Sequence, residues 1–268
     1  MPQSRSRLLY LLRQSSSADE INGLISGIGE LRCAGEWNMV SQAWARARQW
    51  RRSIASLSEM QEHGHTPDLY SFGAAISACH RCSQWEEVTA LLTKMTASGL
   101  QPDAVCYNAA ISACGKKRCW KRALQLLDEM RKAGLAPNVI SFNSAMCACG
   151  DSGQCTRALA LLQEMQQTGP TPNVISFSTA ISACEKDRRW ERALSLLDEA
   201  RRDGVMPNTT CFSAAISACE KAGQCMRRAM EYCWLICVAP ASNQMLSAST
   251  RPSQHVRGLA SGNQPSLC

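Results

Sequence analysis

The sequence predicts an all-α fold, an α-solenoid assembled from helical hairpins of 35 residues each. The first observation is a period: proline followed by Asp or Asn recurs every 35 residues, at Pro67, Pro102, Pro137, Pro172 and Pro207. The second is that apolar residues within each period follow helical spacing. The third is composition, since aromatics make up only 6% and Ala, Leu, Met and Cys carry much of the apolar content. That mixture favours helices over strands.

Other positions repeat in the same register and set the limits of each unit. An aromatic residue follows four positions after the Asp or Asn, as Phe72, Tyr107, Phe142, Phe177 and Phe212. A glycine lies three positions before each proline, as Gly64, Gly99, Gly134, Gly169 and Gly204. The predicted units are therefore 69–103, 104–138, 139–173 and 174–208. A truncated copy at 209–232 does not reach its own glycine or proline.

Each unit is predicted to contain two helices. In the first, Phe177, Ile181 and Cys184 fall at helical spacing and can form one buried stripe. The second reads WERALSLLDEA in the same unit, with Trp190 and Leu197 on its apolar face. Glycine is expected to end this helix in a left-handed cap, and proline prevents its extension. One hairpin cannot bury its apolar face alone, whereas stacked neighbours can.

Residues 21–68 are predicted to form a degenerate unit. Trp50 and Met60 keep its second helix in register. Its first helix has two alternatives. Segment 35–48 is in place but lacks an apolar stripe, whereas segment 27–37 resembles 75–85 but requires a 13-residue insertion between the helices.

The two ends differ in composition from the repeats. Residues 1–20 form a basic leader that is rich in Ser and Arg, with three arginines before the first acid at Asp19. This composition is typical of an organelle transit peptide, and the alternative is a frayed basic terminus. Residues 233–268 lose the pattern, are rich in Ser, Asn, Gln and Gly from Pro240 on, and are expected to be a disordered tail.

Composition also narrows the class of protein. Five of the 16 cysteines recur every 35 residues, at Cys79, Cys114, Cys149, Cys184 and Cys219, which indicates a repeated packing position and not a disulfide framework. No apolar run approaches the roughly 18 residues of a membrane-spanning helix. The net charge of +7 suits a polyanionic partner.

The 35-residue hairpin, its aromatic first helix and its Gly-x-x-Pro-Asp/Asn ending resemble the pentatricopeptide repeat over residues 69 to about 228. The resemblance implies a right-handed superhelix that binds single-stranded RNA, at about one base per repeat, in a mitochondrion or chloroplast. The rival tetratricopeptide repeat has a period of 34 and a W-x-x-L-G-x-x-Y first helix that is missing here.

The resemblance implies that two residues per unit read one base edge: the residue after the aromatic and the residue after the closing proline. The pairs Asn108 with Asn138 and Asn143 with Asn173 resemble pyrimidine readers, and Ser178 with Asn208 resembles an adenine reader. The implied target is pyrimidine-pyrimidine-adenine, read 5′ to 3′ from the N-terminus. Three further units depart from this pattern. In one, Gly73 has no side chain to read a base beside Asp103, and in the truncated unit Ser213 has lost its partner. The pair Asn38 with Asp68 resembles a uracil reader only if Asn38 lies on a first helix.

The resemblance also implies base-packing and phosphate-binding positions. The second residue of each unit would pack between adjacent bases; this position holds Tyr70, Val105, Ile140, Ile175 and Thr210. A basic residue near the end of the first helix would meet phosphate; this position holds Arg81, Lys116, Lys186 and Lys221, and Asp151 interrupts the run.

Simpler alternatives exist for these residues. The Asp or Asn after each proline can be a helix N-cap, and the other polar positions can be a solvated helix face. The array as a whole can be a protein-binding scaffold. The four histidines have no companion constellation, and Cys79-x-x-Cys82 lacks a second pair of ligands, so we expect no catalytic residue, metal or cofactor. We expect a monomer that binds single-stranded RNA and an RNA-processing protein, and no membrane.

Overall fold

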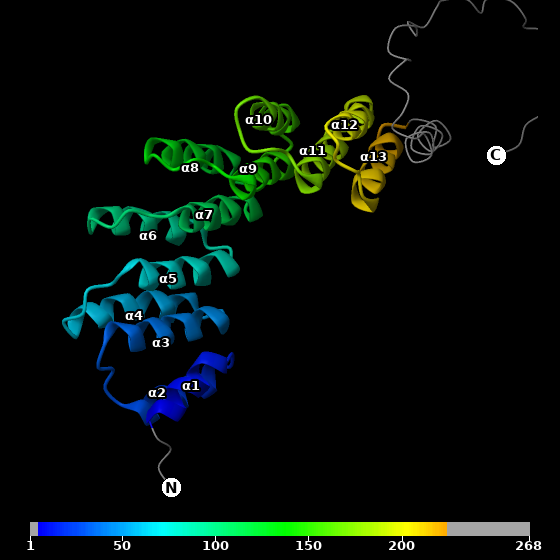
Figure 1. Cartoon of the computed structure of the whole chain (residues 1–268). Helices are drawn as coiled ribbons and strands as arrows, with labels where there is room; N and C mark the ends of the chain where they lie inside the picture. The colour runs from blue at the N-terminus through cyan, green and yellow to red at the C-terminus, as the bar shows by residue number, and fades with distance from the viewer. Residues whose placement is uncertain (1–4, 224–268) are drawn as a thin grey trace, which may run out of the picture.

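The computed structural model describes residues 5–223, and every regular element in that range is an α-helix. The helices are α1 (Arg5–Gln14), α2 (Ala18–Ile28), α3 (Ala34–Arg46), α4 (Trp50–Glu62), α5 (Leu69–Arg81), α6 (Trp85–Ala97), α7 (Ala104–Lys116), α8 (Trp120–Lys132), α9 (Val139–Asp151), α10 (Cys155–Gln167), α11 (Val174–Lys186), α12 (Trp190–Arg202) and α13 (Thr209–Lys221). They stack into a curved array (Figure 1), which confirms the predicted α-solenoid. The end of the truncated unit and the tail at 233–268 lie outside the described residues.

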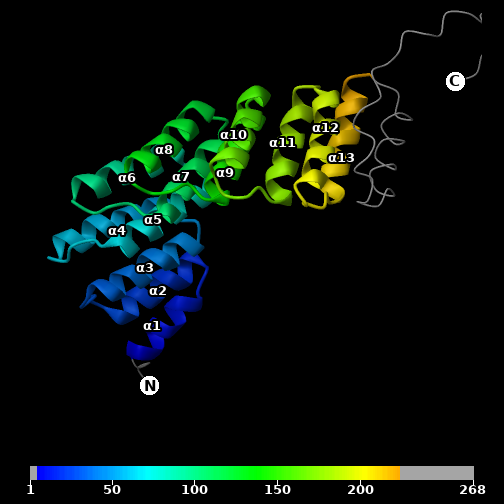
Figure 2. The same cartoon turned by 45° about the horizontal axis from the view of Figure 1, so that its top comes forward.

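Two rows of helices run along this array. Helices α3, α5, α7, α9, α11 and α13 form the first row, and each packs directly on the next. Each second-row helix, from α4 to α12, packs between the first helix of its own unit and that of the following unit. Second-row backbones lie farther apart and are bridged by long side chains, such as Arg131 with Glu164. The array therefore bends, and the first row lines the inner side of the arc (Figures 1 and 2).

The first-row helices from α5 onward begin at a capped residue. The side-chain oxygen of Asp68, Asp103, Asn138, Asn173 or Asn208 accepts a hydrogen bond from the backbone N–H three residues later. Such a cap stabilises a helix by about 1 kcal/mol. The prediction that these residues are helix N-caps is therefore confirmed. A capping residue can also contact a ligand, so the cap does not exclude a reading role.

Most second-row helices end as the repeated glycine predicts. Gly64, Gly99, Gly134 and Gly204 have φ values of 79°, 78°, 77° and 75°, which are accessible to glycine without strain. The prediction is wrong at Gly169, which is not among the residues with positive φ. Pro170 follows it directly, and a residue before proline is pushed towards extended conformations.

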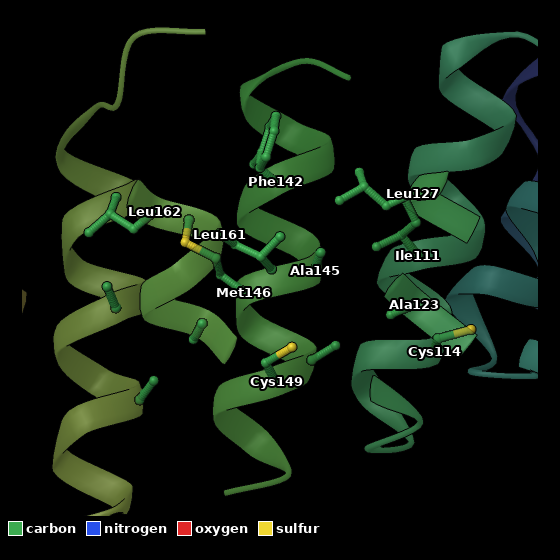
Figure 3. Packing of buried hydrophobic residues seen from close by; sticks show 14 of the residues in the cluster. Ile111, Cys114, Ala123, Leu127, Phe142, Ala145, Met146, Cys149, Leu161 and Leu162 are labelled. Carbon is green, nitrogen blue, oxygen red and sulfur yellow. The ribbon is translucent and has the colours of Figure 1, made fainter. Parts of the chain in front are cut away.

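One continuous apolar core runs between the two rows. In the unit that contains α9 and α10, Phe142, Met146 and Cys149 of the first helix share one buried cluster with Leu161 and Leu162 of the second (Figure 3). All five repeated cysteines are at most 1% exposed, which confirms their packing role. Burial raises the pKa of Cys79 to about 12 and that of Cys149 to about 11, so these thiols stay protonated at neutral pH. Trp50, Trp85, Trp120 and Trp190 are half-buried against the same core, as expected for packing residues.

The degenerate unit is a complete hairpin in the regular register. Helix α3 begins 35 residues before α5, and α4 begins 35 residues before α6. The first alternative, segment 35–48, is therefore correct, and the inserted alternative is wrong. The expectation that this segment lacks an apolar stripe is also wrong, because Trp37, Val40 and Trp44 are buried.

A further pair of helices, α1 and α2, precedes the repeats. Leu12, Ile21, Ile28, Val40 and Trp44 form a small apolar cluster that joins this pair to α3. Residues 5–14 of the predicted leader are therefore a packed helix, and the frayed-terminus alternative is wrong for them. Apolar side chains at positions 8–12 and 21–28 pack together and hold α1 in place. The basic composition of the segment did not indicate this packing.

An ion pair ties α1 to α3. The Arg5 guanidinium donates to both carboxylate oxygens of Glu36, at 3.2 and 2.6 Å, and the Arg32 backbone N–H donates to one of them at 2.7 Å. The hydrogen bonds from Arg5 lower the pKa of the Glu36 carboxyl, against the burial that would raise it. Among the described helices, none is long and apolar enough to cross a lipid bilayer.

Candidate nucleic-acid interface

An exposed apolar stripe runs along the first row of helices. The second residue of four successive units remains in solvent: Tyr70, Val105, Ile140 and Ile175 are 71%, 72%, 60% and 56% exposed. The first turn of each helix presents this residue, while the aromatic two positions later turns into the core. These four exposed apolar side chains, repeated at one position of the unit, make the stripe a candidate ligand-binding surface.

The residues after the aromatic lie on the same helices, but their surroundings differ. The amide of Asn108 lies against Asn138, the last residue of its own unit, and against Ser141 of the following unit. Asn38 lies on α3, as its predicted role requires, and contacts Ser71 and Asp68 in the same way. These candidate reading pairs are therefore brought together in space, although about 30 residues separate their members.

The other candidate reading residues do not show this pair of contacts to the following residues. The Oδ1 atom of Asn143 is buried and has no hydrogen-bond partner among the described residues. Ser178 donates to the Ile175 carbonyl of its own helix at 2.9 Å, and Ser213 is exposed on α13. Gly73 supplies no side chain opposite Asp103, whose carboxylate accepts from the Cys106 N–H at 2.8 Å.

The residue after each closing proline uses one oxygen for its cap. Asn138 Oδ1 accepts from the Ser141 N–H at 3.1 Å, and Asn173 Oδ1 accepts from the Ser176 N–H at 3.0 Å. Asn208 Oδ1 accepts from the Cys211 N–H at 3.0 Å. In each of these caps the side-chain oxygen is the acceptor, and the amide nitrogen, which is a donor, takes no part in the cap.

The predicted phosphate-binding residues point back along the first row towards the preceding unit. Lys116 Nζ donates to the His80 carbonyl at 3.2 Å, and Lys221 pairs with Glu185 at 2.7 Å. Lys186 forms an ion pair with Asp151, the residue that interrupts the basic run. Arg81 reaches only the Ala45 carbonyl, at 3.5 Å. A phosphate would therefore compete with an acid at Lys186 and Lys221, and with carbonyls at Lys116 and Arg81.

A cavity of about 210 Å³ between α9 and α11 joins two of these features. Ser178 and Lys186 line it from α11, and Asp151 lines it from α9. A candidate base-reading side chain and a candidate phosphate-binding side chain thus open onto the same hollow between successive first-row helices. Across the described residues, no cluster of three His, Cys, Asp or Glu side chains could hold a metal ion.

Comparisons with known proteins agree with this architecture. Two family profiles match the sequence: the pentatricopeptide repeat domain at residues 55–117 and 90–152, and the PPR repeat family at 137–186 and 172–221. Together these matches cover more than half of the chain. No curated protein matches the sequence.

Solved structures of similar fold are repeat proteins of the same kind. The pentatricopeptide repeat protein PPR10 from maize aligns with a TM-score of 0.52 and 20% identity, over 82% of this chain and 36% of that one. PPR10 in complex with an 18-nt psaJ RNA element aligns with a TM-score of 0.52 and 17% identity, over 87% of this chain and 40% of that one. The PPR domain of Arabidopsis thaliana protein-only RNase P 1 in complex with tRNA aligns with a TM-score of 0.52 and 14% identity, over 60% of this chain and 84% of that one.

At these identities the likeness to solved structures establishes the fold, and the chain spans 36–40% of the length of PPR10. The matched family profiles also establish the family, because they recognise the sequence pattern of successive repeats. This chain belongs to the pentatricopeptide repeat family.

Proposed function

We propose that this protein binds single-stranded RNA in a sequence-selective, non-enzymatic manner along its first row of helices. One observation carries the proposal: the exposed side chains of Tyr70, Val105, Ile140 and Ile175 recur every 35 residues beside polar reading positions. Apolar side chains that pack on base faces and amides that meet base edges are the two elements of modular RNA readout.

The amide chemistry of the central units fits base recognition. The Asn108 and Asn143 side chains each carry a donor and an acceptor, which match the mixed edge of a pyrimidine. The buried Oδ1 atom of Asn143, which has no hydrogen-bond partner within residues 5–223, also supports the proposal, because such an atom is stabilised when a ligand or water supplies a donor. PPR10 and the PPR domain of protein-only RNase P 1 have been solved with RNA, which favours the same ligand here.

The non-enzymatic part of the proposal rests on the sequence, whose four histidines have no companion catalytic constellation. The neighbours named as RNase P proteins match at 14% and 15% identity, which shows a common fold only. Incubation of the protein with end-labelled RNA and Mg²⁺ tests this part. Intact RNA is the expected result, and discrete cleavage products would refute it.

An organellar setting, monomeric state and recruitment of an RNA-processing protein belong to the same proposal. The proposed organellar localisation rests on the basic composition of residues 1–20. Part of this leader is helix α1, which packs on α3 through Leu12. A fluorescent fusion should enter mitochondria or chloroplasts, and N-terminal sequencing of the imported protein should show whether residues 1–20 are removed. A diffuse distribution would contradict the setting.

Fluorescence anisotropy tests the RNA proposal itself. The protein is titrated against a short single-stranded RNA with a UUA or CCA core, and against one with the same bases permuted, at two salt concentrations. We expect preference for the UUA or CCA core and binding that weakens as salt rises. Equal weak binding to all RNAs would mean that charge alone acts, and lack of binding at both salts would favour a protein-binding scaffold.

A further inference from the structure

The hydroxyl of Ser141 connects two neighbouring units at a reading position. Ser141 is the third residue of α9, and its Oγ atom donates to Oδ1 of Asn108 on α7 at 2.5 Å. The same oxygen accepts from the Asn138 backbone N–H at 3.2 Å. The Nδ2 group of Asn108 makes a long contact of 3.4 Å to Oδ1 of Asn138. One end of the Asn108 amide is therefore oriented by Ser141 of the following unit, and the other end by Asn138, which closes the unit of Asn108 itself.

An equivalent arrangement occurs two units earlier. Ser71 Oγ donates to Asn38 Oδ1 at 2.5 Å, and Asn38 Nδ2 donates to both carboxylate oxygens of Asp68 at 3.2 Å. Rotation of the Asn38 amide by 180° would turn its oxygen towards that carboxylate, which is unfavourable because both groups are acceptors. The serine hydroxyl thus meets the same end of the amide in two separate units.

We propose that Ser141 is a positioning residue that, together with the Oδ1 atom of Asn138, fixes the polarity of the Asn108 amide and thereby sets the choice between uracil and cytosine in that unit. This inference rests on the proposed RNA-binding function. Uracil presents an N–H donor at N3, whereas cytosine presents an acceptor there and a donor at the exocyclic amine. An amide held with its oxygen on one side matches one of these patterns, and a freely rotating amide matches either.

The next unit of the same chain provides a comparison for the contact between Ser141 and Asn108. Ser176 occupies the same position in the next unit and forms the same capping box with Asn173. Its hydroxyl lies 3.1 Å from Asn173 Oδ1, just as the Ser141 hydroxyl lies 3.1 Å from Asn138 Oδ1. The two units differ at the reading residue after the aromatic, since Asn143 Oδ1 has no hydrogen-bond partner in the described range. Cys106 and Cys211 fill this position elsewhere, so the fold accommodates a thiol there.

The experiment compares Ser141→Cys with Ser176→Cys. Both substitutions keep the size of a fully buried side chain and weaken a capping box, but only the first removes a hydroxyl that contacts the reading residue after the aromatic, Asn108. Affinities are measured by fluorescence anisotropy for RNAs with UUA, CUA and UCA cores. The first two differ at the base assigned to Asn108, and the first and third differ at the base assigned to Asn143.

We expect the wild-type protein to distinguish UUA from CUA, and Ser141→Cys to reduce that ratio by roughly two- to tenfold, as for the loss of one hydrogen bond. Ser176→Cys should leave the ratio of UUA to UCA affinities unchanged. If Ser141→Cys lowers affinity for both RNAs equally, or if the two variants behave alike, Ser141 is only structural and the inference fails. A wild-type protein that binds RNA without distinguishing the pyrimidines also overturns the inference but leaves RNA binding intact. If the protein binds no RNA, the proposed function itself fails.

Discussion

Gly150 of α9 and Ala183 of α11 approach so closely that a methyl group on Gly150 would lie 2.9 Å from the Ala183 Cβ and 3.3 Å from its Cα. This contact sets the spacing of two successive first-row helices beside the cavity that contains Ser178. Glu185 and Glu220 occupy the equivalent position in later units, so the close approach is particular to this junction.

Gly150→Ala should therefore destabilise the protein by about 1–3 kcal/mol, because part of the obstruction is backbone. Gly115→Ala is the matched control, since its new methyl would lie 3.5 Å from the Ala148 Cβ, an ordinary contact. Alanine has the higher helix propensity, so the control should be neutral or stabilising by up to about 1 kcal/mol. Urea denaturation followed by circular dichroism measures both. Equal effects of the two changes would contradict the close contact.

Asn138→Asp separates the capping role of this residue from its reading role. Aspartate caps a helix about as well as asparagine, so thermal stability should change little. The unit would then carry Asn108 opposite a carboxylate, as Asn38 lies opposite Asp68. Family resemblance associates this pair with uracil, so the affinity ratio of UUA to CUA should rise. Anisotropy titrations measure this ratio. If the variant has the same ratio of UUA to CUA affinities as the wild type, Asn138 only caps the helix and does not read a base.

Asp151→Asn should strengthen RNA binding. The substitution removes a negative charge from the first row and releases Lys186 from its ion pair. One additional phosphate contact should steepen the dependence of log affinity on log salt by about 0.7 for a single strand. The slope is measured by anisotropy between low and moderate salt, with Asp198→Asn on the second row as a charge-matched control. The same slope in both variants would mean that Lys186 does not meet phosphate.

Docking of α1 on α3 should depend on pH through Glu36. Its pKa is lowered in the folded protein, mainly by hydrogen bonds from Arg5, relative to an ordinary value of 4.5. The pair therefore contributes its full stability above that ordinary value, and the contribution is lost as pH falls through the lowered one. Hydrogen exchange of α1 amides should accelerate in acid. In Glu36→Gln the exchange should already be fast at neutral pH, and slow exchange there would exclude the ion pair as the cause.

Much of the fold could be predicted because the repeat places its structural residues at fixed positions. Pro172, Asn173 and Phe177 recur with the same spacing in other units, and each first-row helix from α5 onward begins where a predicted unit begins. Trp37 lies 35 residues before Phe72 and could have identified α3. The inserted alternative instead matched this tryptophan with Trp85, and no proline precedes Trp37 in the usual place.

Other features depend on contacts that no local pattern encodes. Helix α1 is stabilised through Leu12 and Arg5, which meet partners more than 20 residues away. The candidate reading residues were predicted, but the different settings of Asn108 and Asn143 were not, because each depends on the side-chain rotamers of the following unit. The pairing of Lys186 with Asp151 likewise requires the stacking of first-row helices.

The most direct test of sequence-selective readout is to change the code at one unit. Asn143→Ser gives this unit the same pair that Ser178 and Asn208 form in the next one. Anisotropy is measured with RNAs that carry a pyrimidine or adenine at the second base of the core. We predict that the preferred second base changes from pyrimidine to adenine, while the preference at the first base stays the same. Equal weakening for all RNAs, with no change in the preferred base, would contradict base reading by these side chains.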